Sequence, residues 1–183
     1  MKKSDRTHKL IENTMLTILN ERELSQITIN EICEQASITR STFYNHYHDK
    51  YQILEGINAE ICSQMNDHFE KRLHSKKIDK LLITLISHID KDKFLLMIDI
   101  QDENVNLKRD LQNNIEKHFN VFLETLASKN NLSIPNIVFI KQLFSSSALV
   151  FIESSIRHGQ TEENSIFLNT LNNMMLEHYN IKI

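Results

Sequence analysis

Apolar residues return every three or four positions over several stretches of the chain, which is the spacing of one face of an α-helix. The stretch that follows Thr28 is short, and its apolar residues lie at i, i+3, i+4 and i+7 with polar residues between them. This pattern predicts a short helix that packs inward through Ile29, Ile32, Cys33 and Ala36.

Longer stretches with the same period follow. An apolar stripe predicts one long helix over residues 49–73, made of Tyr51, Leu54, Ile57, Ile61, Met65 and Phe69. The polar residues 74–80 predict a linker. Gly159 predicts the end of one helix and Thr161 the start of the last. Beyond the linker, helical segments are expected at residues 81–89, 94–100, 104–127, 135–158 and 162–179.

Helix-start signals are dense between residues 28 and 54. Thr28 with Glu31 has the T-x-x-E form of a capping box, Thr39 can cap a second helix, and Asp49 with Gln52 can cap a third. In the second helix Phe43 and Tyr47 lie four apart and are expected on the buried side. Its exposed side is then Arg40, Ser41, Thr42, Tyr44, Asn45 and His46.

That exposed side has the chemistry of a surface that binds the DNA major groove. Arginine and asparagine form paired hydrogen bonds with guanine and adenine edges, and hydroxyl groups bond to several bases. The amides at a helix N-terminus also favour the anionic backbone. A small three-helix core with a polar outside is the alternative, but three capped starts around one such helix favour DNA binding.

Composition points to an all-α protein. The 183 residues are 40% hydrophobic and include 2 glycines and 1 proline, which leaves little material for strands joined by tight turns. We identify no apolar run near the roughly 18 residues that span a bilayer, and no apolar signal segment at the start. A cytoplasmic protein without membrane contact is therefore expected. Cys33 and Cys62 are isolated, so buried thiols are expected.

Other function classes receive little support. We find no catalytic or nucleotide-binding fingerprint, so no enzyme and no cofactor is expected. The 9 histidines include no H-x-x-x-H pair, so no metal site is expected. The net charge of −3 is unevenly distributed, because residues 1–10 hold four basic residues and one acidic residue. Such a basic tip suits phosphate contacts, although a solvated terminus has the same composition.

The segments TINEICEQA, SITRSTFYNHY and DKYQIL resemble the DNA-binding region of TetR/AcrR-type transcriptional regulators. The resemblance is strong over residues 28–54 and extends to the first helix at 6–24, where the inner face is Leu10, Ile11, Thr14, Met15, Ile18 and Leu19. It implies an all-α fold. An N-terminal three-helix helix-turn-helix domain would cover 1–48, or up to about 65 with the connecting helix, and its helix-turn-helix would lie at about 28–47. A helical ligand-binding and dimerisation domain would cover 66–183.

The resemblance also implies roles for individual residues. Phosphate contacts would fall on Thr28, Tyr44 and Lys50, while His46 would touch a phosphate or lie solvated at the rim. The chain departs from the family at Ser37 and Glu23, where glycine is usual. A serine in a left-handed turn costs about 1 kcal/mol relative to glycine. The base-contacting surface would be Thr39, Arg40, Ser41, Thr42 and Asn45.

As partners, the resemblance implies a palindromic double-stranded DNA operator, a second copy of the chain and a small-molecule inducer. The homodimer would form through residues 135–179, although an intramolecular core fits those apolar positions equally well. An adaptor that acts through a protein partner is the alternative function, because residues 1–50 hold seven basic and seven acidic residues. A ligand pocket, or simply core, would be lined by Phe94, Met97, Phe119, Phe122, Phe139 and Phe144.

Overall fold

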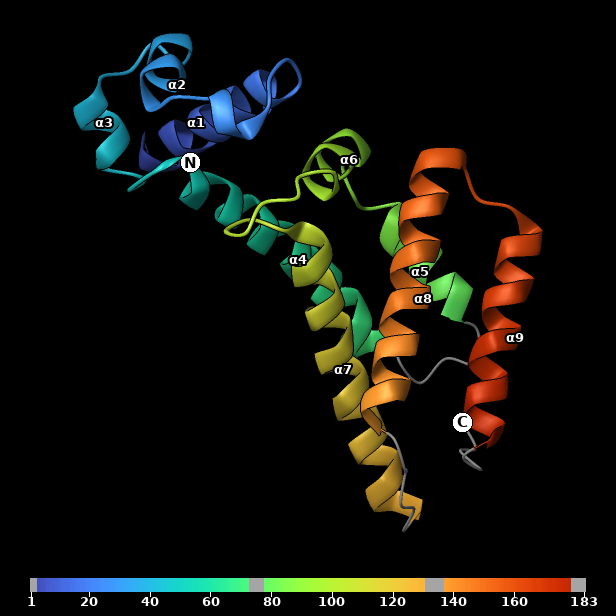
Figure 1. Cartoon of the computed structure of the whole chain (residues 1–183). Helices are drawn as coiled ribbons and strands as arrows, with labels where there is room; N and C mark the ends of the chain where they lie inside the picture. The colour runs from blue at the N-terminus through green and yellow to red at the C-terminus, as the bar shows by residue number, and fades with distance from the viewer. Residues whose placement is uncertain (1–2, 73–77, 131–136, 179–183) are drawn as a thin grey trace. The chain divides into compact units, whose positions relative to one another are not determined.

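The regular structure of the described residues is entirely helical, as expected. The computed structural model describes residues 3–72, 78–130 and 137–178. Within these ranges it contains nine α-helices and one short 3₁₀ helix, η1 (Figure 1). They are α1 (Lys3–Leu19), η1 (Leu24–Gln26), α2 (Ile29–Gln35), α3 (Arg40–Tyr44), α4 (Lys50–Arg72), α5 (Ile78–Ile86), α6 (Lys91–Ile98), α7 (Leu107–Asn130), α8 (Ile137–His158) and α9 (Glu162–His178).

The chain divides into two compact units. Unit 1 consists of Met1–Glu60 and Asp92–Leu107, and unit 2 consists of Ile61–Lys91 and Lys108–Ile183. The N-terminal helices therefore share a unit with α6, which the boundary near residue 65 had assigned to the C-terminal domain. That difference arises because α6 is separated in sequence from the helices with which it is grouped, so helical periodicity does not reveal it.

The core of unit 1 is formed by the apolar faces of α1, α2, α3 and α4. Most of the expected inner positions of α1 and α2 are buried, but Leu10 was placed wrongly, since it is 44% exposed at the edge of the α1 stripe. In the α4 stripe Tyr51 is half-buried, and the stripe residues from Leu54 to Met65 are buried. Phe43 of α3 is fully buried in this core. The other fully or nearly fully buried residues include Ile11, Met15, Ile18, Ile32, Ile53, Leu54 and Ile57.

Local signals fix the turn between α2 and α3. The amide of Glu31 donates to Thr28 Oγ1 at 3.2 Å, which confirms the cap of α2. The reciprocal half of the box is wrong, because the Glu31 carboxylate pairs with Arg22 at 3.0 Å. At the other end of α2, Ser37 has a φ of 52°, the left-handed conformation expected from the resemblance. The amides of Ser37 and Ile38 donate to Glu34 and Cys33, which is a Schellman motif.

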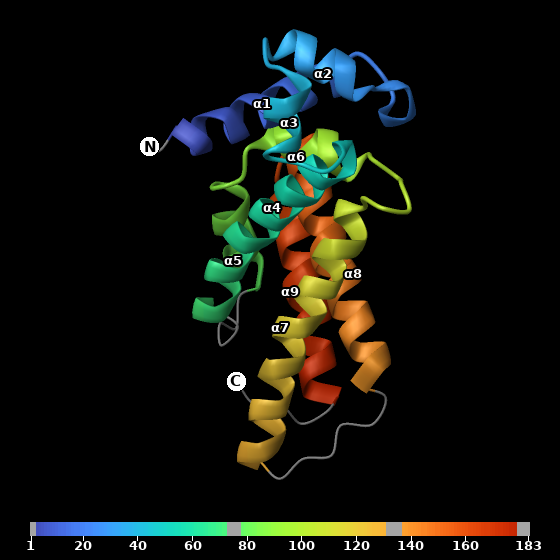
Figure 2. The same ribbon diagram turned by 90° about the vertical axis from the view of Figure 1, so that its left-hand side faces the viewer.

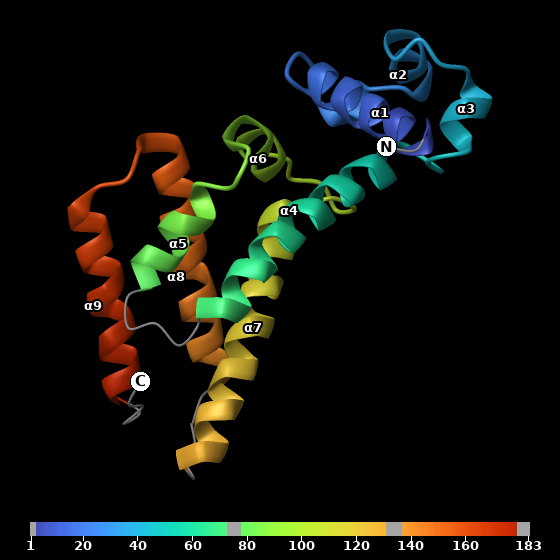
Figure 3. The ribbon, with the colours of Figure 1, turned by 180° about the vertical axis from the view of Figure 1, so that it is seen from behind.

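Unit 2 is built around α7, α8 and α9, whose ribbons run alongside one another (Figures 2 and 3). The helix α5 contacts both α8 and α9. Side-chain pairs show that α7 and α8 are antiparallel, since Lys108 lies 3.5 Å from Glu153 while Lys141 donates to Asn120 at 3.1 Å. The predicted apolar faces of these helices supply most of the buried side chains.

By length and composition α8 is the one helix of the described residues that would be able to cross a membrane. We had identified no apolar run of that length, because Ser145, Ser146 and Ser147 interrupt the sequence. Averaged over the whole helix, the apolar content is nevertheless high. Its residues Phe144, Ala148, Leu149 and Ile152 are buried against other helices of unit 2. The apolar character of α8 is that of a core helix.

The turn between α8 and α9 follows the predicted signals. Gly159 has a φ of 82° directly after α8, and the amide of Asn164 donates to Thr161 Oγ1 at 3.1 Å. Several expected positions lie outside the described residues or their described side chains, so they remain predictions. They are Lys2 and Lys3, Phe69, residues 73–77, Leu126, Pro135, Met175 and Tyr179.

Candidate DNA-binding surface

The helix α3 holds most of the residues expected to contact bases. It begins after Thr39, whose Oγ1 accepts the amide of Thr42 at 3.1 Å, and this confirms the predicted cap. The predicted anchors are also confirmed, because Phe43 is fully buried and Tyr47 is 4% exposed. Their burial turns the opposite side of α3 outward.

The outward side of α3 presents four of the predicted DNA contacts. Arg40, Ser41 and Asn45 are exposed, and Tyr44 is 46% exposed despite its size. Arg40 makes no hydrogen bond or ion pair with the described residues, so its guanidinium keeps all five donors. The Tyr44 ring packs edge-on against the Phe43 ring, with centroids 5.5 Å apart.

The predicted threonine contacts already have local partners. Thr39 Oγ1 and Thr42 Oγ1 lie 2.9 Å apart, and Thr28 Oγ1 accepts the Glu31 amide. A threonine hydroxyl retains an acceptor lone pair after one such bond. The hydroxyl groups of these three threonines therefore already bond at the N-termini of α2 and α3. A contact with DNA would be made in addition to these bonds.

Lys50, for which a phosphate contact is predicted, already has partners within unit 1. Its Nζ donates to the carbonyl oxygens of Leu24 at 2.6 Å and Ile27 at 2.8 Å, and more weakly to that of Ser25 at 3.4 Å. An ammonium group has three donors, and all three are directed at the end of η1. Lys50 thus fastens the start of α4 to η1, and a phosphate would have to displace one of these carbonyls.

His46 is half-buried and contacts α1. Its ring lies edge-on to that of His8, with centroids 5.0 Å apart. His8 in turn bonds to Tyr47, and so does Glu12. Sequence reasoning missed this contact of α1 with α3, because His8 and Glu12 lie beside the apolar stripe of α1. Their spacing of four residues on one helix was the available signal.

The residues suggested for a ligand pocket fall into separate places. Phe94 and Met97 are fully buried in unit 1, whereas Phe119, Phe122 and Phe144 are buried in unit 2. Phe119 stacks on Phe144 with centroids 3.8 Å apart and planes within 3°. The sixth residue, Phe139, is 64% exposed. Within unit 2 the structure thus brings together Phe119, Phe122 and Phe144.

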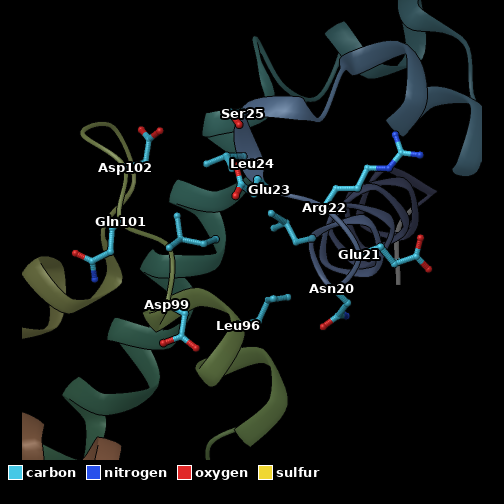
Figure 4. Close-up of a pocket in the computed structure, with 12 residues that line it drawn as sticks. Asn20, Glu21, Arg22, Glu23, Leu24, Ser25, Leu96, Asp99, Gln101 and Asp102 are labelled. Atoms are coloured by element: carbon cyan, nitrogen blue, oxygen red, sulfur yellow. The ribbon is translucent and has the colours of Figure 1, made fainter.

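A cleft of about 580 Å³ in unit 1 has a different lining (Figure 4). Its lining comes from residues 19–25 on one side, and from Leu96 and residues 99–102 on the other. Its carboxylates are Glu21, Glu23, Asp99 and Asp102, and its basic residue Arg22 is paired with Glu31. None of the six suggested pocket residues lines this cleft.

Two curated proteins resemble the chain over part of its length, while no family model matches it. An uncharacterized HTH-type transcriptional regulator of Bacillus subtilis, YxbF, is 30% identical over 88 residues, which are 45% of this chain and 23% of YxbF. The dhaKLM operon transcriptional activator DhaS of Lactococcus lactis is 27% identical over 109 residues, 57% of this chain and 54% of DhaS. The chain therefore spans about half of the length of DhaS and about a quarter of the length of YxbF.

Solved structures match nearly the whole chain in fold. GusR of Salmonella enterica covers 97% of this chain and 98% of its own, with a TM-score of 0.70 and 14% identity. The match to a TetR transcriptional regulator of Streptococcus agalactiae covers 92% of this chain and 94% of that protein, with a TM-score of 0.64 and 20% identity. The match to RolR in complex with resorcinol covers 94% of this chain and 88% of RolR, with a TM-score of 0.53 and 17% identity. The fold and the capped α2–α3 pair define a helix-turn-helix protein. The fold of the chain is therefore that of the TetR transcriptional regulator structure it matches, and part of its sequence is similar to two HTH-type transcriptional regulators.

Proposed function

We propose that the chain is a sequence-specific DNA-binding transcriptional regulator, in which α3 enters the major groove. The observation that carries this proposal is the capped α3, with buried Phe43 and Tyr47 on one side and outward Arg40, Ser41, Tyr44 and Asn45 on the other. Such donors and acceptors distinguish base pairs in the major groove, whereas contacts with phosphate only position the protein. The exposed Arg6 and Lys9 of α1 would add phosphate contacts.

Selection of bound sequences from random DNA tests the proposal directly. We expect enrichment of a palindromic site. We also expect Arg40→Ala to weaken binding to that site by a factor of about 5 to 150, since a paired arginine–guanine contact contributes about 1–3 kcal/mol. Arg109→Ala is the matched control, because Arg109 lies in unit 2 with its side chain 51% exposed. A chain that enriches no sequence, and instead captures a protein partner, would support the adaptor function.

We further propose that two copies associate through α8 and α9. Val150 is 62% exposed and Phe167 is 71% exposed, and both line a groove between the two helices with Phe151, Leu168 and Leu171. Ile166 and Met174 of α9 are also exposed. Exposed apolar residues gathered in this way are typical of a protein interface. A twofold dimer would match a palindromic operator with half-sites about 34 Å apart.

Sedimentation of Phe167→Glu against Val121→Glu tests the dimer. Val121 is 57% exposed on α7, outside the α8–α9 groove, so it offers a control of similar exposure. A buried charge without a partner strongly disfavours an interface, so we expect Phe167→Glu to sediment as a monomer at concentrations where wild type and Val121→Glu are dimers. A Phe167→Glu protein that stays dimeric would exclude this surface.

The third part of the proposal concerns regulation. The chain acts as a repressor, and a small-molecule inducer releases it from DNA. Support comes from RolR, which was solved with resorcinol, whereas DhaS is named an activator. In this chain the aromatic stack of Phe119, Phe122 and Phe144 would be the apolar wall of the site, with Ser145 and Glu116 beside it at 3.1 Å from each other. An operator-linked reporter, with and without compounds of this chemistry, decides whether binding represses and whether a ligand releases it.

A further inference from the structure

The orientation of α3 requires contacts from outside the helix. With five residues, α3 is far shorter than the about 12–15 residues at which an isolated helix becomes marginally stable. The burial of Phe43 and Tyr47 holds α3 against unit 1, but burial of apolar area is non-directional. Directional bonds are needed to fix how far α3 turns about its own axis.

The Tyr47 hydroxyl makes two such bonds, both with α1. It lies 2.5 Å from His8 Nδ1 and donates to Glu12 Oε1 at 3.2 Å. His8 and Glu12 are four residues apart, so they flank the hydroxyl from successive turns of one helix. The Tyr47 ring also lies edge-on to the His8 ring, with centroids 4.6 Å apart. The end of the α3 segment is thereby held at a single point on α1.

The direction of each hydrogen bond follows from the chemistry of the three groups. Burial, and secondly the neighbouring Glu12 carboxylate, raise the pKa of the Tyr47 hydroxyl, so it stays protonated and donates to Glu12. It then accepts from His8, which requires a proton on His8 Nδ1. Helix α4 passes close to the same carboxylate, since a methyl group at Gly56 would lie 3.9 Å from Glu12 Oε1.

The same bonds also support a predicted DNA contact. His46 is adjacent to Tyr47, and its ring packs edge-on against His8. Displacement of His8 would therefore release His46 together with Tyr47. Asn45 and Tyr44, both exposed, lie directly before them in the chain. A small rotation at this end changes which side chains can reach base edges, and paired base contacts tolerate little misplacement.

We infer that the His8–Tyr47–Glu12 hydrogen bonds set the rotation of α3, and that His8 and Glu12 act as positioning residues for sequence discrimination. This inference rests on the proposed DNA-binding function. The positioning residues touch no base. Their effect appears in the ratio between the affinities for the selected operator and for random DNA, because random DNA is held through phosphates alone.

The test compares four variants at one salt concentration. Tyr47→Phe keeps the buried ring and removes the hydroxyl, and His8→Leu removes the donor. We expect His8→Leu to lower the operator-to-random ratio about fivefold, the effect of one hydrogen bond, and Tyr47→Phe, which removes both bonds, to lower it at least as much. His8→Asn restores a donor near the position of Nδ1 and should return the ratio to within about twofold of wild type. Asn13→Leu, at an exposed position on the same helix, should leave the ratio unchanged.

Thermal unfolding confirms that the compared variants are folded. Unchanged ratios in folded Tyr47→Phe and His8→Leu would overturn the inference, and so would a His8→Asn variant no better than His8→Leu. Nitrogen NMR of the His8 ring keeps this outcome separate from failure of the proposed function. We expect Nδ1 to be protonated in wild type and this preference to be lost in Tyr47→Phe. An identical His8 tautomer in both proteins would overturn the inference even if the chain bound no DNA.

Discussion

The outward face of α3 and the outward face of α8 and α9 differ in the kind of group they expose. The α3 face presents Arg40, Ser41 and Asn45 above a buried aromatic base, whereas the α8–α9 face presents Val150 and Phe167. Directional polar groups can distinguish bases, while apolar area favours association without specifying a small ligand. The proposal that unit 1 binds DNA and that unit 2 binds a second copy of the chain rests on this difference.

Phenylalanine provides the largest contrast between the two surfaces. Phe43→Ala should lower the free energy of unfolding of unit 1 by about 3–5 kcal/mol, because it leaves a cavity at a fully buried position. Phe167→Ala, at an exposed position, should have an effect that depends on protein concentration, since it weakens an association. Denaturant unfolding at two protein concentrations measures both. The comparison would be contradicted if the loss of unfolding free energy caused by Phe43→Ala changed with protein concentration. It would also be contradicted if the loss caused by Phe167→Ala did not.

Two lysines provide the next contrast. Lys50→Met removes a charged donor from the carbonyls of Leu24 and Ile27 and should cost about 1.5–3 kcal/mol of unfolding free energy. Lys108→Met breaks one exposed ion pair with Glu153 and should cost less than about 1 kcal/mol.

The salt dependence of operator binding separates the two roles considered for Lys50. If Lys50 only fastens α4 to η1, the slope of log affinity against log salt stays the same in Lys50→Met once the protein is folded. If Lys50 neutralises a phosphate, the slope falls by about 0.9. A reduced slope would support the phosphate contact that the sequence predicts for Lys50.

Ser37 and Gly159, the two left-handed residues in the part of the chain that the structure describes, should respond to substitution in opposite directions. Ser37→Gly should stabilise the chain by about 1 kcal/mol at most, because glycine adopts a φ of 52° without strain but gains freedom in the unfolded chain. Gly159→Ala should destabilise it by a similar amount of about 1 kcal/mol from backbone strain alone, since no atom lies within 4 Å of the new methyl group. Thermal unfolding of the pair measures the difference. If both substitutions changed the unfolding temperature in the same direction, the comparison of the two turns would be contradicted.

Near neutral pH the smallest expected effect concerns the Cys62 thiol. Burial, and secondly Asp110, raise its pKa to about 11. The folded chain then holds a proton that the unfolded chain releases near its ordinary thiol pKa of about 8.5, so Cys62 contributes stability that declines as the pH rises from there toward the folded value. Cys62→Ala should therefore lose stability less steeply over this interval than wild type. Identical pH slopes would contradict the raised pKa.

The sequence by itself determined the local structure of the α2–α3 region. Thr39 accepts the Thr42 amide and Ser37 takes the left-handed turn because caps and turns depend on residues within a few positions of one another. The buried faces of the long helices were predictable for a similar reason, since a 3.6-residue period requires no knowledge of the partner helix. The membership of α6 in unit 1 carried no such signal.

Only the tertiary structure decided which side chains meet across long separations in sequence. Lys50 reaches carbonyls 23 to 26 positions earlier, and Tyr47 reaches His8 and Glu12 across 39 and 35 positions. The six suggested pocket residues were divided between two units for the same reason. Helical period fixes which face of each helix is apolar, but pairing between helices depends on their packing angle and register, which no local pattern encodes.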